Sequence, residues 1–529
     1  MATIAEGGTT AGAKPVVVPK AAYYALFVLT CANLLNYLDR QIVSILAQAM
    51  KADLKLDDAD LGFLLGTAFA VFYSVIGIAM GRISDGLPRK KVMAFGLTLW
   101  SAMTALGGAA TSFASLGAAR IGVGVGEAVA TPCAQSMLAD IFPQRNRAVA
   151  MSIYLSGTFL GGALAMIVGG YFLEHWKDMC TAVPIGGACG LAGWKAALIA
   201  VGLPGVPLAF ALLAIKEPAR TTQAKGSAGR FVLGEFASAL PPFTLLTVWR
   251  VGAARGLARN LMLAGGLAVT AALVTRLTGD AAQWWSFALG AYAVVTWGQI
   301  QSYRDKPLFA VTFGDATFLL GTIATALIAC IGGAVHVWSA PYAMRTYDIP
   351  AHEIGASLGL VHVGGAIIGV LVGGWTVDRW KQRDARAPLG MAAICLVLSL
   401  PMITMIMLVH DYRVFLAGTF ALGLLSAAFS GGLAAMIQDL VLPRMRGAAA
   451  AAFSLVAIVI ASGMGPYWAG KVSAVTGSLT AGLLSVMILA PVALVLLWFA
   501  ARRLPHETPA ARRARAEAAG EPPLPAPLS

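Results

Sequence analysis

Residues 81–91 read GRISDGLPRKK, and residues 374–383 read GWTVDRWKQR. In both copies a Gly is followed four residues later by Asp and then by a basic run. A Gly at a helix end lets a neighbouring helix approach, the Asp can pair with an Arg or a helix N-terminus, and the basic run anchors a loop on the cytoplasmic side of a membrane. The repeat therefore predicts two equivalent halves, each with a loop that can open and close.

Both copies follow apolar stretches long enough to cross a bilayer. The chain has 529 residues, of which 58% are hydrophobic and 12% are charged, and this composition excludes a soluble multidomain protein. Two further apolar runs, near 261–277 and 284–301, separate the halves, and an even insertion preserves the sidedness of the later spans. We expect an all-α polytopic membrane protein of two six-helix bundles with about fourteen spans. The other spans are expected near 21–50, 59–83, 90–112, 115–140, 147–173, 194–215, 315–343, 354–376, 388–409, 413–438, 449–472 and 478–501.

The spans divide the chain into five parts. These are a tail at 1–20, a bundle at 21–216, a central segment at 217–306, a second bundle at 307–502 and a tail at 503–529, which is rich in Ala, Arg and Pro and expected to be disordered. No apolar core or small-residue cleavage site precedes the first span, which argues against a cleaved signal peptide.

Charge predicts the sidedness of the loops. The positive-inside rule places the basic loops and both termini in the cytoplasm, so we expect a multi-pass protein of the cell (inner) membrane. The first loop on the opposite side is acidic. The basic residues of the cytoplasmic loops are Arg82, Arg89, Lys90, Lys91, Arg145, Arg147, Arg379, Lys381, Arg383, Arg386, Arg444, Arg446, Arg502 and Arg503, and the acidic ones opposite are Asp53, Asp57, Asp58 and Asp60.

The central segment from Arg220 to Asn260 mixes basic and apolar side chains around Pro241 and Pro242. Such a segment is typical of an amphipathic helix at an anionic lipid surface, interrupted at the prolines. A solvated cytoplasmic linker is the alternative. The net charge of +13 does not indicate a nucleic-acid partner, because the basic residues fall in these loops and form no stripe with aromatics.

The six cysteines show no metal spacing, and four of them fall inside apolar spans, where they are expected to pack as small hydrophobic residues. Cys180 and Cys189 flank a Gly-rich loop on the non-cytoplasmic side. A disulfide between them and two free thiols are both open. No metal or other cofactor is expected.

Charged residues inside two predicted spans are the strongest functional signal. Asp39 and Arg40 lie within the first span, and Arg120 and Glu127 lie seven residues apart in the fourth, on one helix face. An ionisable group at this depth is unfavourable by several kcal/mol unless it faces a protein interior or water. These residues therefore predict a functional constellation.

Three motifs add a family resemblance. The paired loops resemble the cytoplasmic motif of the major facilitator superfamily, whose two halves rock about a midplane site. Within that superfamily the chain resembles the spinster family of lysolipid transporters. Pro88 stands where the loop motif usually has Gly, and Gln382 stands where its second copy is usually basic. The motifs that carry the family resemblance are Asn36-Tyr37-Leu38-Asp39-Arg40, Arg120-Ile-Gly-Val-Gly-Val-Gly126-Glu127-Ala128 and Gly463-Met-Gly465-Pro466-Tyr467-Trp468-Ala-Gly470.

Helical spacing assigns roles to these charges. Asn36 or Tyr37 shares one side of the first helix with Arg40, so Arg40 is expected to face the central cavity and to hold an anionic headgroup, while Asp39 points away. Burial favours the neutral form of a carboxyl group, so Asp39 and Glu127 are candidates for proton binding, with Arg120 opposing this effect. The resemblance implies the same coupling positions. A static ion network that fixes the two helices is the alternative.

Other residues are predicted with less support from the pattern. His336 and His362 could titrate or donate to a headgroup, or they could be hydrogen-bonded packing residues. The glycines of 122–126 are expected to pack helices, because no strand precedes them and Glu127 occupies the third glycine position of a nucleotide loop. The residues expected to form the conformational latch are Gly81, Asp85, Arg89, Gly374, Asp378 and Arg379.

These observations favour a proton-linked secondary transporter for an amphiphile with an anionic or zwitterionic head, such as a lysophospholipid or a sphingolipid-like molecule. A proton symporter of small organic anions is the alternative. A membrane enzyme is disfavoured, because the sequence carries no metal pair, nucleophile elbow or catalytic Cys/His set. The expected partners are the bilayer, the amphiphilic or organic-anion substrate and protons, and the protein is expected to be a monomer.

Overall fold

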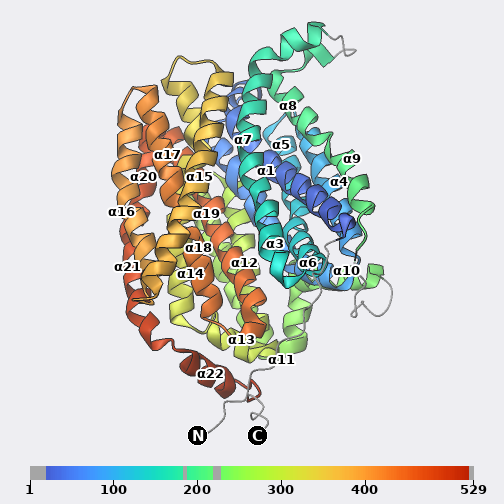
Figure 1. The fold of residues 1–529 in the computed structure, drawn as a ribbon, viewed down its shortest axis with the longest axis vertical. Helices are drawn as coiled ribbons and strands as arrows, with labels where there is room; N and C mark the ends of the chain where they lie inside the picture. Colours follow the sequence, from blue (N-terminus) through green and yellow to red (C-terminus); the bar gives the residue numbers. More distant parts are fainter. Residues whose placement is uncertain (1–18, 183–187, 218–227, 524–529) are drawn as a thin grey trace, which may run out of the picture.

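The computed structural model describes residues 19–182, 188–217 and 228–523, and the regular elements in these ranges are helices (Figure 1). Twelve helices or joined helix pairs in these ranges are long and apolar enough to cross a membrane. Helices α4 and α12 are outside that set, yet α4 packs within the first bundle and α12 packs on α11 and α3. The predicted all-α fold with about fourteen spans is confirmed.

The first bundle contains six spans in the described ranges, and three of them are broken. The second span consists of α2, a π-helical turn and α3, the fourth consists of α5 and α6, and the sixth consists of α8 and α9. Side-chain caps begin several helices; Asp57 and Asp60 form a reciprocal capping box at the start of α2. The elements are α1 (Lys20–Leu54), α2 (Asp58–Gly62), η1 (Phe63–Thr67), α3 (Ala68–Gly86), α4 (Arg89–Gly107), α5 (Phe113–Glu127), α6 (Ala130–Ile141), α7 (Gln144–Ala182), α8 (Gly193–Gly202) and α9 (Gly205–Leu213).

The second bundle repeats the arrangement, and α16 and α19 carry internal prolines. Figure 1 places this bundle beside the first, with α15 next to α7, and the two helices are in contact. Its elements are α14 (Ala316–Thr346), α15 (Ala351–Lys381), α16 (Ala387–Leu408), α17 (Tyr412–Ala428), α18 (Ser430–Asp439), α19 (Arg446–Thr476), α20 (Leu479–Ser485), η4 (Val486–Ile488) and α21 (Leu489–Arg503).

From residue 228 on, the segment between the bundles forms four helices: α10 (Ala228–Ala239), α11 (Thr244–Thr278), α12 (Ala281–Arg304) and α13 (Lys306–Val311). The break predicted at Pro241 and Pro242 lies between α10 and α11. Helix α10 packs on α3, and α11 begins well before the predicted span at 261–277. A plain solvated linker therefore does not describe the part of this segment after residue 227.

The predicted disorder of the carboxyl-terminal tail is wrong for helix α22 (Pro509–Ala518). Arg515 pairs with Asp315 at the start of α14 and, at 3.0 Å, with Glu507. Arg444 donates to Glu521 through Nε at 2.7 Å. Asp315 lies 200 residues from Arg515, and Arg444 lies 77 residues from Glu521, so the composition of the tail alone could not show these two pairs.

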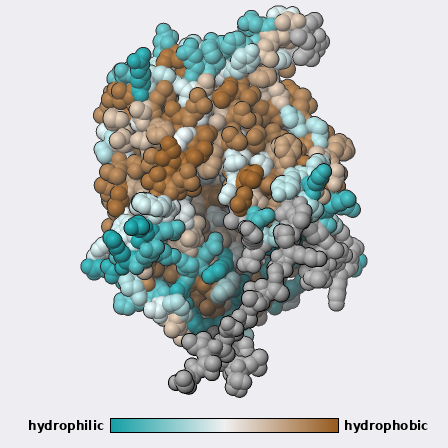
Figure 2. All heavy atoms as spheres, viewed as in Figure 1, coloured by the Kyte–Doolittle hydropathy of each residue, from teal (hydrophilic) through white to brown (hydrophobic). Residues whose placement is uncertain are grey.

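Apolar side chains form a broad belt around the middle of the molecule, and polar residues gather toward both ends (Figure 2). Exposed apolar side chains on the bundle helices include Phe95 of α4 and Leu360 and Leu371 of α15, each at least 68% exposed. A soluble protein does not expose apolar surface on this scale, so the belt identifies the surface that faces lipid. We call the end that carries Asp53–Asp60 the acidic end and the opposite end the basic end.

Candidate functional site

The centre of the first bundle holds an ion pair between two helices. Arg40 of α1 donates from Nη2 to Glu127 Oε2 of α5 at 2.9 Å, and the side chains are 24% and 0% exposed. Arg40 keeps this partial exposure while Glu127 is fully enclosed. The sequence places Glu127 on the same helix face as Arg120, but its carboxylate pairs with Arg40 instead. Helix α5 ends at Glu127 and presents this carboxylate to α1.

Aromatic rings surround the Arg40 guanidinium. Its central carbon lies 4.9 Å from the ring centre of Tyr37, 4.4 Å from that of Phe69 and 5.2 Å from that of Tyr73. A guanidinium within about 6 Å of a ring face is attracted by the ring quadrupole. This aromatic cage fixes the guanidinium and leaves one donor on it without a partner among the described residues, the Nε–H group.

Asp39 is buried and largely unpaired. It is 1% exposed, and neither carboxylate oxygen has a hydrogen-bond partner in the described ranges. Arg120 donates instead to two backbone oxygens, that of Asp39 at 3.3 Å and that of Leu64 at 3.4 Å. Asn36, one turn before Arg40, is 4% exposed with an unpartnered amide nitrogen. Buried polar groups are normally satisfied, so this cluster has an unusual number of free donors and acceptors.

Glycines position the helix that carries Glu127. A Cβ on Gly124 would lie 2.7 Å from the backbone oxygen of Phe69, and one on Gly126 would lie 2.7 Å from the backbone nitrogen of Trp100. Helix α5 therefore touches α3 and α4 backbone to backbone, as expected for glycines in membrane helix packing. This close approach brings Phe69 and Glu127 to the same guanidinium.

His336 and His362 lie in the second bundle and face one another, with ring centres 4.3 Å apart. Both line a cavity of about 460 Å³. Its wall combines apolar side chains from α14, α16, α17 and α19 with several hydroxyls. The hydroxyl-bearing residues are Thr325, Ser339, Ser399, Thr419, Ser426 and Ser430. The structure thus separates the predicted site residues into a charged cluster in one bundle and a histidine-lined apolar cavity in the other.

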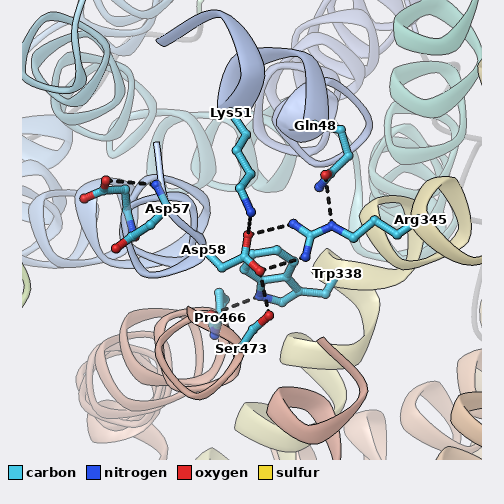
Figure 3. A network of polar contacts seen from close by, with 9 residues as sticks. Gln48, Lys51, Asp57, Asp58, Trp338, Arg345, Pro466 and Ser473 are labelled. Atoms are coloured by element: carbon cyan, nitrogen blue, oxygen red, sulfur yellow. Dashed lines mark hydrogen bonds and ion pairs between the residues drawn. The ribbon is translucent and has the colours of Figure 1, made fainter. Parts of the chain in front are cut away.

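A second polar network closes the acidic end and was missed at the level of sequence (Figure 3). Asp58 of α2 accepts two hydrogen bonds from Arg345 of α14, both 2.7 Å long. It also accepts from Lys51 at 2.5 Å and from Ser473 of α19 at 2.6 Å. Gln48 accepts from Arg345 Nε at 2.9 Å. The network joins the two bundles, and the only sequence signal for it is the acidic loop opposite a basic helix end.

The direct ion pairs between the two bundles gather at this end. Besides Asp58 and Arg345, Glu174 of α7 lies 2.8 Å from His352 of α15. No other ion pair in the described ranges joins one bundle directly to the other. The structure is therefore a conformation closed at the acidic end.

The predicted latch residues of the first loop are only partly engaged. Arg89 is buried and pairs with Asp140 of the first bundle at 2.6 Å and with Glu217, directly after that bundle, at 2.8 Å. The side chain of Asp85 lies outside the described part of the chain. A Cβ on Gly81 would meet no described atom within 4 Å, so the expected close helix approach there is absent in this conformation.

The second loop differs from the first. Asp378 and Arg379 are exposed. A Cβ on Gly374, like one on Gly81, would meet no described atom within 4 Å. Lys381 takes the pairing role and lies 2.5 Å from Asp439 of α18. Each loop thus pairs a basic residue with the end of a helix in its own bundle, although the basic positions differ.

Cys180 and Cys189 form a disulfide at the acidic end, with Cα atoms 5.4 Å apart. Cys180 lies in the last turn of α7 and is fully buried against Trp176. Residues 183–187 of the loop between the cysteines lie outside the described residues. The disulfide ties the end of α7 to the start of the segment that leads to α8.

The chain belongs to the major facilitator superfamily, whose family model matches residues 29–340 and again 317–528. It is 28% identical over 458 residues to an MFS-type efflux pump of Mycolicibacterium smegmatis, a match that covers 86% of this chain and 85% of the pump. It is 29% identical over 315 residues to protein spinster homolog 1 of Homo sapiens, covering 59% of this chain and 52% of that protein.

The spinster branch is also found among solved structures. An inward-facing, occupied bacterial homologue of the human lysosomal transporter spinster superposes with a TM-score of 0.70 at 20% identity, covering 94% of this chain and 100% of that one. At this identity the likeness shows the fold. Together with the curated relatives, it confirms the predicted resemblance to spinster-like transporters of this superfamily.

Proposed function

We propose that this chain is a proton-coupled secondary transporter that moves an amphiphile with an anionic or zwitterionic head by alternating access. The observation that carries the proposal is the caged Arg40 paired with an enclosed Glu127, next to the unpartnered Asp39. A partly exposed cation with an unpartnered donor suits an anionic headgroup, and enclosed carboxylates suit proton uptake. A matched relative, 29% identical over 154 residues, is a sphingosine-1-phosphate transporter of Danio rerio.

The coupling follows from competition for one cation. A headgroup phosphate that binds Arg40 displaces the Glu127 carboxylate, which is then left charged, buried and unpaired. Protonation of Glu127 removes that charge, so substrate and proton binding favour one another. Asp39, one residue from Arg40 and likewise enclosed, is the second proton-binding candidate.

The second bundle supplies the site for the apolar part of the substrate. The cavity of about 460 Å³ is bounded by residues such as Ile328, Leu396 and Phe453, with His336 and His362 on its wall. An acyl chain fits an apolar cavity of this size, and an imidazole can donate to a glycerol or headgroup oxygen. We assign the head to the first bundle and the tail to the second.

The orientation in the membrane follows from charge. The basic loops place the basic end and both termini in the cytoplasm, and a bacterial host would carry the protein in its inner membrane. In this orientation the Asp58–Arg345 network closes the outer side. The conformation described then corresponds to the state that is closed toward the outside.

Purified protein in proteoliposomes with a trapped pH dye tests the proposal. Addition of lysophosphatidylcholine outside should acidify the interior, and Glu127→Gln should abolish this acidification without loss of folded protein. Glu235→Gln is the matched control, because Glu235 lies in α10 and its only described ion pair is with Arg82, 3.5 Å away. An unchanged transport rate and pH profile in Glu127→Gln would refute the coupling role.

Small organic anions are the second candidate. A hexuronate transporter of Bacillus subtilis is 32% identical over 134 residues, covering 25% of this chain and 32% of that protein. A carboxylate would bind Arg40 as a phosphate does but would leave the apolar cavity unused. Acidification by hexuronate and none by lysophosphatidylcholine would favour this candidate.

A further inference from the structure

The inserted helices α11 and α12 have no counterpart in the two six-helix bundles, and α12 lies along the boundary between them. It contacts α3 of the first bundle and α19 of the second. A Cβ on Gly290 would lie 3.3 Å from both Val71 of α3 and Val459 of α19. Ala293, one turn further along, joins Val71 and Val75 in a small buried cluster. One face of α12 therefore fills the α3–α19 seam.

A polar contact joins the same face to both bundles. Gln283, 1% exposed, donates to the Gly463 carbonyl of α19 at 3.0 Å and accepts from Thr67 of η1 at 2.6 Å. Thr67 also contacts the Gly463 carbonyl, 2.5 Å away. Positions 283, 287, 290 and 293 share a helix face at three- and four-residue spacing, and Phe287 packs at Gly463.

The start of α12 is attached to α19 of the second bundle. Asp280 lies 2.7 Å from Lys471 and accepts from Tyr467 at 2.6 Å, and both partners belong to α19. Lys471 also donates to the Thr278 carbonyl at 2.6 Å. Helix α12 is thus held by charged contacts to α19, and its contacts with Thr67, Val71 and Val75 of the first bundle are those that must adjust when the bundles rock.

The opposite seam, between α7 and α15, is organised differently. Cβ atoms on Gly355 and Gly359 of α15 would lie 2.2 and 2.9 Å from backbone oxygens of Met166 and Ala163 on α7. Further toward the basic end, Gly365 and Gly373 of α15 contact α17 instead, and Gly157 of α7 contacts α1. Helices α7 and α15 therefore contact one another near the acidic end, and toward the basic end each packs on a helix of its own bundle.

The basic-end halves of these helices expose apolar side chains. Leu160 of α7 is 48% exposed and Leu371 of α15 is 68% exposed, whereas Val71 and Val459 in the other seam are 0% and 3% exposed. Figure 2, drawn from the side on which α7 and α15 meet, shows the surface hollowed near its centre. No inserted helix contacts α7 or α15 to a comparable extent in the described ranges.

We propose that α11 and α12 seal the α3–α19 seam, so that an amphiphile passes between the bilayer and the central cavity only through the α7–α15 seam. The inference rests on the proposed amphiphilic substrate. The polar contacts of Gln283 and the close fit of Gly290 keep α12 in place, and the opposite seam lets an acyl chain stay in lipid while its headgroup enters the protein.

Photolabelling of the reconstituted full-length protein tests the route. Lysophosphatidylcholine with a diazirine in its acyl chain should form adducts on the basic-end halves of α7 and α15, and unlabelled lysophosphatidylcholine should compete for them. Adducts on α12, α3 and α19 should be at least about tenfold fewer, the ratio that a free-energy difference of ~1.4 kcal/mol gives. The exposed outer face of α11, at Met262 and Val269, gives the background from bulk lipid.

Competed adducts on the buried face of α12 would overturn the seal and leave the proposed function intact. Absence of both competed adducts and lysolipid transport would instead refute the proposed function, and the lateral route with it. A substrate-independent measurement separates these cases. In a Cys31→Ala background, N-ethylmaleimide should modify Leu371→Cys at least about tenfold faster than Val459→Cys.

Two glutamines of α12 provide matched variants for that measurement. Gln283→Leu removes the contact to both bundles, whereas Gln299→Leu removes contacts only to α11, at Asn260 and the Gly256 carbonyl. Modification of Val459→Cys should accelerate severalfold with Gln283→Leu and stay unchanged with Gln299→Leu. Equal modification of Val459→Cys and Leu371→Cys in the parent protein would overturn the seal.

Discussion

Removal of the Arg345 side chain should open the acidic end. Arg345→Ala deletes a two-pronged bond to Asp58, whose side chain is only 5% exposed. Loss of one partner from a buried charge pair is typically unfavourable by about 2–5 kcal/mol. Arg345 itself is 27% exposed and Lys51 still neutralises Asp58, so the lower limit applies. A change of ~2 kcal/mol shifts the equilibrium between closed and open states about 30-fold.

Lys51→Met is the matched control. Lys51 binds the same carboxylate at 2.5 Å but belongs to α1, in the same bundle as Asp58. Its loss does not remove a bond between bundles, and Arg345 still compensates the Asp58 charge. We therefore expect a shift well below that of Arg345→Ala, which separates the effect of the interbundle bond from a general loss of positive charge.

Spin labels on the two bundles can measure this opening. Ala52→Cys in α1 and Val475→Cys in α19 place labels at exposed positions on either side of the boundary, with Cys31 replaced by Ala. Double electron–electron resonance should show a longer-distance population in Arg345→Ala that is rare in the parent and in Lys51→Met. Identical distance distributions in all three, with folded protein confirmed by gel filtration, would refute the gating role of Asp58 and Arg345.

Contacts elsewhere predict three further outcomes. Gly124→Leu should abolish folded protein, because even a Cβ at this position would lie 2.7 Å from the Phe69 backbone oxygen. Gly77→Ala is the control, since a Cβ on Gly77 would meet no described atom within 4 Å, and it should leave the melting temperature unchanged in fluorescence-detected gel filtration. A hydrogen bond from Arg444 lowers the pKa of Glu521 below its ordinary value of 4.5. Docking of the tail should therefore persist at pH values above 4.5 and weaken as the pH falls through the lowered pKa. Constant mobility of a spin label on Ala514→Cys from neutral to acidic pH would contradict this. Cys189→Ser should lower the free energy of unfolding by about 2–3 kcal/mol, and an unchanged melting temperature on reduction of the parent would exclude that contribution.

The sequence predicts the bundles well because their spans depend on a local property, apolar length. Long apolar runs such as 316–346 and 446–476 must cover their backbone polar groups internally, and helices do so. Features that depend on distant partners escaped prediction. Helix α22 is stabilised by Asp315, about two hundred residues earlier, and the helix boundary near Thr244 depends on packing of α10 and α11.

The same distinction applies to the site. Asp39, Arg40, Arg120 and Glu127 could be selected because a charge inside an apolar span is conspicuous. The pairing of Arg40 with Glu127 could not be predicted, since the two residues lie 87 positions apart in the chain. Asp58 was visible only as one of several acidic residues in a loop, and a polar residue at a helix end has many ordinary explanations, so its bond to Arg345 required the structure.

The two charged clusters follow opposite energetic logic. Asp58 accepts hydrogen bonds from three side chains, whereas both oxygens of the equally buried Asp39 lack a partner in the described ranges. A saturated carboxylate between bundles stabilises one conformation strongly, and the chain can leave that conformation only if binding elsewhere supplies a comparable free energy. The unsatisfied groups around Arg40 and Asp39 are where a substrate or proton can supply it. Weakening the gate through Arg345 should therefore lower the dependence of opening on substrate, and opening of Arg345→Ala that still requires substrate to the same extent would contradict this balance.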